Sequence, residues 1–526
     1  MKHRPLTLNS HLTWILLLVF ILVGATLRLY ALDGQSLWND ELESWRQSNF
    51  PTLDAVLTKG SIPDTHPPIF QITLFFVERY LGSSETLLRL PSAIAGILSI
   101  AAMFWLGTIA FGNEEGLISA FLTAVLWVPI SYSQEARNYS FLILFSVLSG
   151  GFWLLAAKYI RDGERFGIQV CIGYILCALL ACFTHYFGTF LILLQGIGLL
   201  ILAFIYRRSR GQVIALYAVV LVGYLPWLPF AITQFNHADL ISWIDPPEVT
   251  FFPAFIAFLF NRLKPLGLLV LVSYGFLFLS LLRHSDDQPS AHQLRRLLTS
   301  TEFLLGYWLV VPISIIYLVS LIISPVLTQR NLLISLPPAY LLLSRAITRL
   351  SKKRYIELIL VSVFGVIPLL HMVFVLGYYR YPDKEQFREA VRYVVDMHDP
   401  EGNEAIIGNA KYPDYFDYYF MRFGSDLRVD LMLKENQDIP ALDRYINSQQ
   451  INRFWYISGH AMPKSDLIEL IEQRYSLLDE KTFLGAHVWK FAVMQKQSGS
   501  ISGDQREASR ERLYLSESLL TSIVQP

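Results

Sequence analysis

The sequence predicts a polytopic α-helical membrane protein with about eleven transmembrane helices, interfacial helices and a small C-terminal α/β domain. Composition is the first reason: of the 526 residues, 53% are hydrophobic and 16% are charged, whereas soluble domains carry roughly 25% charged residues. The second reason is that apolar runs of near-spanning length recur as far as residue 376. The third is that shorter apolar stretches of helical and strand character alternate beyond that point.

The first apolar run, at about 12–32, follows Lys2 and Arg4. It is longer than the core of a signal peptide and no small-residue cleavage site follows it, so we interpret it as a retained signal anchor. Ten further runs have a length close to that of a transmembrane helix. They lie at about 88–111, 115–131, 138–157, 166–184, 186–206, 212–232, 264–282, 302–323, 331–347 and 355–376.

Lys and Arg residues are concentrated in every second loop between these runs. The basic loops lie at about 158–165, 207–210, 283–296 and 345–354. The positive-inside rule places these loops in the cytoplasm together with the N-terminus. The loops between them, and the C-terminus, are then expected on the outer side.

The apolar stretch 67–81 does not fit this alternation as a transmembrane helix. It begins with Pro67-Pro68 and carries Glu78 and Arg79. As a helix it would be about 22 Å long, which is shorter than the hydrocarbon core of about 30 Å. We therefore expect it to lie along the outer interface without crossing.

With this topology, ionisable side chains gather in the outer loops. Ionisable groups beside a bilayer usually line a water-filled cavity instead of facing lipid. The residues concerned are Asp40, Glu41, Glu43, Asp64, His66, Arg89, Glu135, Arg137, His185, Arg330 and, in the aromatic loop 233–262, His237, Asp239, Asp245 and Arg262.

Each of these residues also has a structural interpretation. Asp40 and Glu41 can be solvated loop acids, and Glu135 and Arg137 can form an ion pair near a helix end. His185 at a helix start can be a packing histidine, and Arg330 can extend to lipid headgroups. The functional interpretation therefore depends on the joint pattern and not on any single member.

Other features narrow the classes of function. The formal net charge is zero, which gives no reason to expect nucleic-acid binding. All three cysteines, Cys171, Cys177 and Cys182, fall in one apolar segment. Neither a disulfide framework nor a metal cluster is implied by cysteines in such a position.

Several of these segments resemble bacterial glycosyltransferase family 39. The family includes proteins similar to protein O-mannosyltransferases and to the lipid A aminoarabinose transferase, within the C-type superfamily of membrane glycosyltransferases. The resemblance covers about residues 10–490. It is carried, in this order, by Trp38-Asn39-Asp40-Glu41, His66-Pro67-Pro68, Arg89-Leu90-Pro91, Tyr132-Ser133-Gln134-Glu135-Ala136-Arg137, Thr184-His185-Tyr186 and Arg330.

The resemblance implies the GT-C type of fold and an inverting transferase in a bacterial cytoplasmic membrane. It implies a polyprenyl-phosphate-linked sugar donor and an extracytoplasmic active site in which Asp40 is the first-loop acid. The sequence lacks the Asp-x-Asp motif of the metal-dependent oligosaccharyltransferases and has Glu135 and Arg137 there instead. Metal dependence therefore stays open, and no other cofactor is implied.

The residue types suit this chemistry independently of the resemblance. Attack of a hydroxyl on an anomeric carbon needs a base, and Asp40 can take that proton. The leaving lipid phosphate gains negative charge, and the guanidinium groups of Arg137, Arg330 and Arg89 suit its oxygens. The remaining candidates, which either hold a divalent cation or orient the base, are Glu41, His66, Glu135 and His185.

Beyond residue 377 the sequence predicts alternating helices and strands, which indicates an α/β domain. Helices are expected at 387–397, 412–423 and 465–475, and strands at 405–408, 453–458 and 488–494. The predicted domains are a transmembrane domain at 1–376, whose first outer loop with interfacial helices is 33–87, an extracytoplasmic domain at 377–494 and a disordered tail at 495–526.

A transporter or flippase of lipid-linked sugars is the main alternative, because it would share the helices, the cavity and the arginines. Transporters more often contain internal repeats and charged, broken helices at the midplane, and we find no clear repeat. A noncatalytic membrane scaffold is a second alternative, but it would not need polar groups from five loops. The sequence does not specify the sugar, or whether the acceptor is a lipid, a protein or a glycan.

Overall fold

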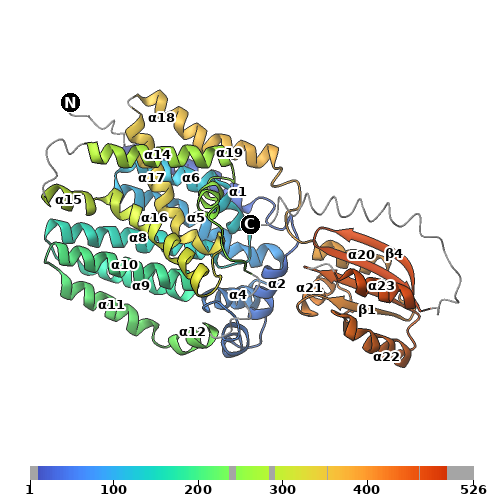
Figure 1. Ribbon diagram of the computed structural model, residues 1–526. Coiled ribbons are helices and arrows are strands. Elements are labelled where there is room, and N and C mark those ends of the chain that lie inside the picture. The colour runs from blue at the N-terminus through green and yellow to red at the C-terminus, as the bar shows by residue number, and fades with distance from the viewer. Residues whose placement is uncertain (1–9, 236–243, 284–290, 352, 461–462, 494–526) are drawn as a thin grey trace. The chain divides into compact units, whose positions relative to one another are not determined.

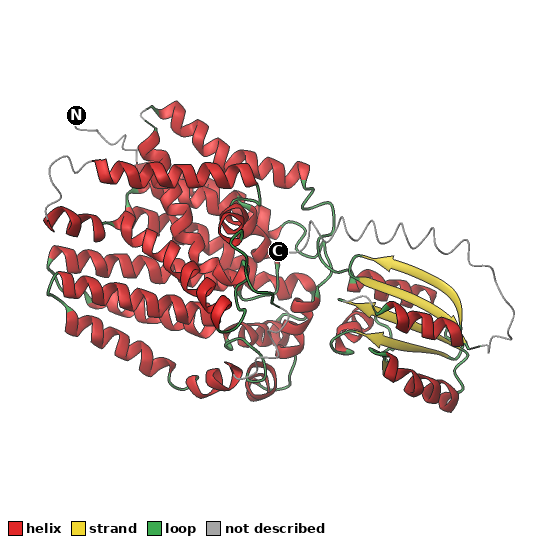
Figure 2. Ribbon diagram, viewed as in Figure 1, coloured by secondary structure: helices red, strands yellow, loops and turns green. Residues whose placement is uncertain are grey.

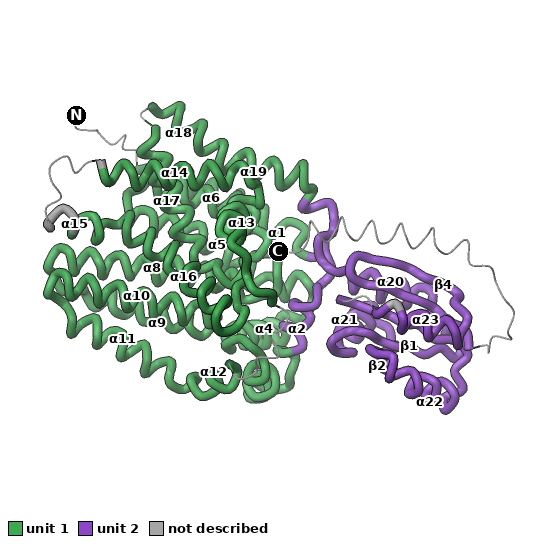
Figure 3. The backbone as a smooth tube through the Cα atoms, in the orientation of Figure 1, with its two compact units in different colours: residues 1–32, 47–377 green, residues 33–46, 378–526 purple. Residues whose placement is uncertain are grey.

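The computed structural model describes residues 10–235, 244–283, 291–351, 353–460 and 463–493 (Figure 1). The chain divides into two compact units (Figure 3). Residues 1–32 and 47–377 form the first, which we call the helical unit, and residues 33–46 and 378–526 form the second, the C-terminal unit. The division falls within helix α2 (Asn39–Ser48).

Among the described residues of the helical unit, seven helical segments are long and apolar enough to cross a membrane. They are α1 (Ser10–Leu29), α5 (Glu85–Ala110), α8 (Tyr139–Asp162), α10 (Tyr186–Ile205), α14 (Lys264–Arg283), α16 (Thr301–Ile322) and the segment Arg354–Val375, which comprises α18 (Arg354–Val361), η5 (Ser362–Val366), α19 (Ile367–Leu370) and η6 (His371–Val375).

Two further apolar stretches are each divided into a bent pair of helices. The first pair bends by 58° and the second by 72°, so the described chain has up to nine spans if each pair counts as one. The pairs are α6 (Asn113–Val125) with α7 (Trp127–Ser131) and η2 (Tyr132–Gln134), and α11 (Arg210–Tyr224) with α12 (Leu228–Phe235).

The count of seven to nine is lower than the predicted eleven because two predicted runs form shorter elements. The run 166–184 forms α9 (Ile168–Thr184), a helix of 17 residues. The run 331–347 begins as a 3₁₀-helix, η4 (Arg330–Ser335), and continues as α17 (Leu336–Leu350). Pro337 and Pro338 lack the amide hydrogens that would continue an α-helix from the preceding turn.

The predicted interfacial stretch forms α4 (Ile69–Tyr80), a helix of 12 residues. A helix of this length extends for about 18 Å and is too short to cross a bilayer. The remaining short elements of the helical unit are α3 (Leu53–Ala55), η1 (Val56–Ser61), α13 (Phe251–Leu259) and α15 (Ala291–Leu298).

Helix α5 lies at the centre of the helical unit and packs against α1, α6 and α8 (Figure 1). The core includes Trp153 and Trp308, whose rings meet edge-on with centroids 6.2 Å apart. Buried carboxylates at the starts of α6 and α16 are joined by α17: Arg345 lies 2.7 Å from Glu115 and 3.2 Å from Glu302. This network ties three helices together at one end of the unit.

The C-terminal unit contains a sheet, whose strands are yellow in Figure 2. The sheet has five strands in the order β2-β1-β3-β5-β4. Strands β2, β1 and β3 are parallel, and β5 is antiparallel to both β3 and β4. The strands are β1 (Glu404–Asn409), β2 (Leu431–Met432), β3 (Arg453–Gly459), β4 (Ser476–Phe483) and β5 (Ala486–Ala492). The helices are α20 (Phe387–Met397), α21 (Asp414–Arg422), η7 (Asn436–Asp438), α22 (Ile439–Gln449) and α23 (Ser465–Arg474).

Both faces of this sheet are covered, because alternate residues of β3 are buried against different layers. Phe454 and Tyr456 belong to the core that includes α22 and α23. Trp455, on the opposite face, meets Tyr393 of α20 edge-on. The predicted α/β class is therefore confirmed, although β2, α22 and β4 were not predicted. The predicted tail at 495–526, and His237 and Asp239 of the aromatic loop, lie outside the described residues.

Candidate functional site

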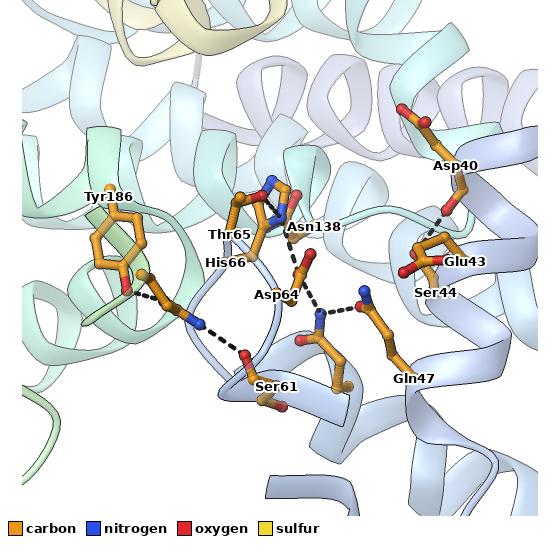
Figure 4. Close-up of polar contacts among 12 residues, drawn as sticks. Asp40, Glu43, Ser44, Gln47, Ser61, Asp64, Thr65, His66, Asn138 and Tyr186 are labelled. Atoms are coloured by element: carbon orange, nitrogen blue, oxygen red, sulfur yellow. Dashed lines mark hydrogen bonds and ion pairs between the residues drawn. The ribbon is translucent and has the colours of Figure 1, made fainter. Parts of the chain in front are cut away.

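Asp64 and His66 occupy the loop between η1 and α4, and their side chains are paired. His66 Nδ1 lies 3.1 Å from Asp64 Oδ2. Gln71 of α4 donates from Nε2 to the same oxygen (3.4 Å) and to Gln47 Oε1 (3.0 Å). Figure 4 shows Asp64, His66 and Gln47. Burial alone would raise the pKa of Asp64, but the charge and hydrogen bond of His66, together with the charge of Arg137, lower it to about 2. Asp64 is therefore ionised at neutral pH.

His185 forms the connection between α9 and α10 and is 5% exposed. Its backbone is extended, and its Nδ1 accepts the hydrogen of the Phe187 amide at 3.1 Å, which caps α10. Burial and the positive charges of His66, Arg137 and Arg330 hold the pKa of His185 well below its usual range. The ring is therefore neutral, and because Nδ1 accepts, its proton is on Nε2.

The Nε2 atom of His185 is buried and has no hydrogen-bond partner within the described part of the chain. An N–H group in that situation is a donor available to a bound acceptor. We use the term His185 cluster for a group of five residues, namely His185 and the four residues that are linked to its ring by contact or by charge. They are Asp64, His66, Arg137, His185 and Arg330.

The two arginines of the cluster come from separate loops. Arg137 follows η2, and its carbonyl accepts a hydrogen bond from Ser92 of α5 (2.8 Å), which fixes the loop. The guanidinium of Arg137 lies 5.9 Å from the ring centroid of Tyr139, and this ring lies 6.0 Å from that of His185. Arg330 begins η4. The fold thus brings cations from distant positions in the sequence to one histidine.

Glu135 and Arg89 are two further predicted site residues, and both interact with residues outside the His185 cluster. Glu135, Arg262 and Arg330 interact electrostatically with Tyr132. Arg89 is buried in α5 and donates from Nη1 to the carbonyl of Leu32 at 2.8 Å. That contact joins Arg89 to the loop that follows the first span, and its role in phosphate binding stays a prediction.

Asp40, Glu41 and Glu43 belong to the C-terminal unit, in the first turns of α2. Asp40 is partly exposed, and its carboxylate accepts a hydrogen bond from the Asn39 side chain at 3.3 Å. Glu41 is fully buried: it accepts from the Trp38 amide (3.4 Å) and lies 3.6 Å from Lys384 Nζ. These contacts of Glu41 are those of a helix cap and an ion pair.

Two polar residues of the site were not singled out in the sequence. Asn138 donates from Nδ2 to the carbonyl of Thr184 at 2.9 Å and so ties the Arg137 loop to the His185 connection. Gln71 supports Asp64. Asn138 follows directly on the Tyr-Ser-Gln-Glu-Ala-Arg segment, which is a signal that could have identified it, whereas Gln71 has no comparable signal.

Among the residues that the structure describes, no group of three or more His, Cys, Asp or Glu side chains is arranged to hold a metal ion. The roles of Glu41, His66, Glu135 and His185 as ligands of a divalent cation therefore stay predictions.

Comparisons with known proteins identify the fold. Residues 65–178 match the family model described as dolichyl-phosphate-mannose-protein mannosyltransferase. The structure is similar to that of ArnT from Cupriavidus metallidurans in the apo state, with a TM-score of 0.57 and 14% identity, covering 92% of this chain and 98% of that one. It is also similar to ArnT bound to undecaprenyl phosphate, with a TM-score of 0.54 and 13% identity, covering 93% of this chain and 99% of that one.

A third similar structure is an oligosaccharyltransferase from Archaeoglobus fulgidus in complex with zinc and sulfate. Its TM-score is 0.50 at 14% identity, and the alignment covers 91% of this chain and 73% of that one. No curated protein sequence shows a significant match. The resemblance to the C-type membrane glycosyltransferases is thus confirmed, and the chain has their fold.

Proposed function

We propose that this chain, with its C-type glycosyltransferase fold, transfers a sugar from a polyprenyl-phosphate donor to an acceptor hydroxyl with inversion at the anomeric carbon. One observation carries the proposal: Arg137 and Arg330, from separate loops, act on a neutral, buried His185 whose Nε2–H is directed to no protein acceptor in the described chain. Such an arrangement suits an anion with several acceptor oxygens. The family match of residues 65–178 supports a lipid phosphate as that anion.

The phosphate would be held by three hydrogen-bond donors of two kinds. The guanidinium groups of Arg137 and Arg330 match phosphate oxygens in a bidentate manner and keep their charge at any working pH. His185 adds a neutral donor in a buried position. Asp64 offsets part of the positive charge and holds His66 in place. Because of this carboxylate, the cluster does not carry uncompensated cations when the polyprenyl-phosphate sugar is absent.

In the proposed reaction, the acceptor oxygen attacks the anomeric carbon from the face opposite the phosphate. The new carbon–oxygen bond forms as the bond between the anomeric carbon and the phosphate oxygen breaks. Asp40 takes the proton of the acceptor hydroxyl. The lipid phosphate leaves with the bonding electron pair, and the arginines and His185 stabilise the negative charge that develops on it.

The proposal is tested with the purified full-length protein and a panel of radiolabelled undecaprenyl- and dolichyl-phosphate sugars. Transfer or release of sugar is expected from the wild type and not from Asp40→Asn, whereas Arg137→Gln or Arg330→Gln should each lower kcat/KM by about 100-fold. Arg208→Gln is the matched control. Arg208 lies beyond the end of α10 that is opposite His185, and it donates to the Gly163 carbonyl.

Two results would contradict the proposal. One is full transfer by a folded Asp40→Asn protein. The other is retention of all label on the original lipid by the wild type with every acceptor offered, accompanied by movement of that lipid between leaflets, which would favour a transporter. Cysteine labelling at positions 40 and 137 gives a further check, because the proposed roles require both positions to be reached from the same side of the membrane.

A further inference from the structure

Residues 33–46, which we call the acidic segment, are folded into the C-terminal unit although about 330 residues of sequence separate them from the rest of it. Tyr419 of α21 is the central contact. Its buried hydroxyl accepts hydrogen bonds from the Leu37 amide (2.6 Å) and from Ser36 Oγ (3.1 Å). Ser36 Oγ in turn accepts from the Arg388 amide at 3.0 Å. The backbone that leads into α2 is therefore fixed by α20 and α21.

The first turn of α2 is also held by the C-terminal unit. The Asn39 amide is one of the N–H groups that a helix start leaves without an intrahelical partner. It donates to Glu385 Oε2 at 2.8 Å, and Glu385 Oε1 lies 2.6 Å from His460 Nδ1. Glu385 is itself confined by the β4–β5 turn, since a Cβ at Gly485 would come within 2.7 Å of Glu385 Cγ. Asp40 directly follows Asn39 in the sequence.

The glutamates beside Asp40 are used as anchors. Glu43 Oε2 accepts from the Tyr415 hydroxyl at 2.5 Å, and Glu43 Oε1 lies 3.5 Å from Lys411 Nζ. Burial would raise the pKa of Glu43, but the hydrogen bonds from Arg46 and Tyr415 outweigh it and lower the pKa. Glu41 is paired with Lys384. Both glutamates thus attach the segment to the C-terminal unit.

One face of α21 supplies several of the contacts to the acidic segment. Tyr415, Tyr418 and Tyr419 are spaced by three and four residues and so lie on one side of the helix. Tyr418 packs edge-on against Trp45 with ring centroids 4.8 Å apart. Tyr412, just before the helix, lies under Arg46, whose Cζ is 3.8 Å from the ring centroid. The tyrosine-rich composition of this helix therefore has a specific use.

We propose that the C-terminal unit is the positioning scaffold of the candidate base, in which Glu385 and Tyr419 fix the backbone of residues 37–39 and thereby the direction of the Asp40 carboxylate. The proposal rests on the function proposed above for Asp40. It makes Glu385 and Tyr419 positioning residues, because neither needs to touch a substrate. It also gives the α/β domain a use in the proposed reaction.

The test combines hydrogen exchange with transfer kinetics in the full-length protein. Tyr419→Phe removes the shared hydroxyl, and Glu385→Ala removes the acceptor of the Asn39 amide. Each variant is expected to speed amide exchange in the 33–46 peptide by about ten-fold or more, because a protecting hydrogen bond is lost. Each is also expected to lower kcat at least ten-fold while KM for the polyprenyl-phosphate sugar stays within two-fold.

Matched controls come from the same unit. Tyr393→Phe removes a hydroxyl that donates to Asp479 at 2.5 Å, and Asp443→Ala removes a carboxylate that accepts from Tyr475 at 2.5 Å. Both should leave exchange in 33–46 and transfer unchanged. Tyr419→Phe alters a buried group and can lower the thermal midpoint of the whole unit. In that case the result for Glu385→Ala, which alters a partly exposed side chain, tests the positioning role.

The outcomes are distinguishable. Unchanged exchange in both variants would overturn the scaffold, and faster exchange with unchanged kcat would overturn the positioning role. A rise in KM without a fall in kcat would also contradict it, since that pattern indicates donor binding. If the wild type shows no transfer at all, the proposed function fails, and exchange in the 33–46 peptide still decides whether the C-terminal unit holds the acidic segment.

Discussion

The rings of His66 and His185 meet edge-on, with centroids 5.2 Å apart and planes inclined by 75°. The two histidines have different partners: His66 is joined to the Asp64 carboxylate, whereas His185 accepts a backbone amide hydrogen. The negative charge of Asp64 thus lies on the side of His66. The His185 ring remains neutral, and the charges of Arg137 and Arg330 act on it.

This arrangement predicts opposite effects for two substitutions of His185. In His185→Asn the side-chain oxygen can still cap α10, but no donor reaches the position of Nε2. We expect thermal stability to be retained and affinity for undecaprenyl phosphate to fall by about ten-fold, the effect of one hydrogen bond to a charged group. Binding is measured with the labelled lipid phosphate in nanodiscs.

His185→Gln is the complementary variant. Its longer side chain can present an N–H near the position of Nε2, but it loses the cap, which costs about 1 kcal/mol. We expect better lipid-phosphate binding than in His185→Asn together with a lower thermal midpoint. Equal binding by both variants and the wild type would exclude His185 from the phosphate site.

Arg345 is expected to be a stability determinant of the helical unit. It lies 2.7 Å from Glu115 and 3.2 Å from Glu302, both of which are mostly buried. Arg345→Met would leave two carboxylates without this partner, and we expect a loss of about 3 kcal/mol. The change is measured as a shift of the thermal midpoint in detergent. Arg345→Lys keeps the charge but cannot reach both carboxylates equally, so an intermediate shift is expected; no shift in either variant would contradict the structural role.

The side chain of Glu78 is expected to make a pH-dependent contribution to the stability of the helical unit. It accepts a hydrogen bond from Ser48 Oγ at 2.5 Å, and burial raises its pKa to about 7 from the ordinary value of 4.5. Between these two pH values the folded state binds more protons than the unfolded state, so stability falls as the pH rises through this window. Glu78→Gln, which cannot ionise, should remove that slope.

The measurement is the thermal midpoint in detergent from pH 4.5 to pH 8. The wild type should lose stability relative to Glu78→Gln as the pH increases, and the difference should level off above pH 7. Glu164→Gln, at an exposed position, is the control. Parallel curves for the wild type and Glu78→Gln would show that Glu78 has an ordinary pKa.

Local sequence patterns predicted those parts of the fold that depend on local physics. Helix α20 occupies 387–397 as expected, because Phe387, Ala390, Val391 and Val394 recur at helical spacing and are all buried. Strand β4 was not predicted, because it is the edge strand beside β5 and most of its residues are exposed. An exposed edge strand has no apolar alternation by which it could be recognised.

The candidate site divides in a similar way. Arg137, His185 and Arg330 could be picked out because ionisable residues next to apolar runs are costly unless they have a use, and their catalytic roles stay predictions. The attachment of Leu37 to Tyr419 could not be picked out. These residues are 382 positions apart, and neither has a local pattern that indicates the other. Long-range pairing of this kind depends on tertiary packing alone.

The contribution of His487 to the stability of the C-terminal unit is expected to increase with pH, whereas that of Glu78 decreases. It is 3% exposed in β5, stacked on Trp489, and burial lowers its pKa to about 4 from 6.5. Below pH 6.5 the unfolded chain gains a proton that the folded chain does not take up until about pH 4. The contribution of His487 is therefore fully present above pH 6.5 and is lost as the pH falls to 4.

His487→Asn removes the titrating ring and should flatten this part of the stability curve. Hydrogen exchange of the 486–492 peptide separates the effect from titrations in the helical unit, since it reports opening of β5 itself. The wild type should open more readily at pH 4.5 than at pH 7, after correction for intrinsic exchange, and the variant should show a smaller difference. An equal pH dependence in both proteins would mean that other groups cause the change, because no pKa shift of His487 would then be needed.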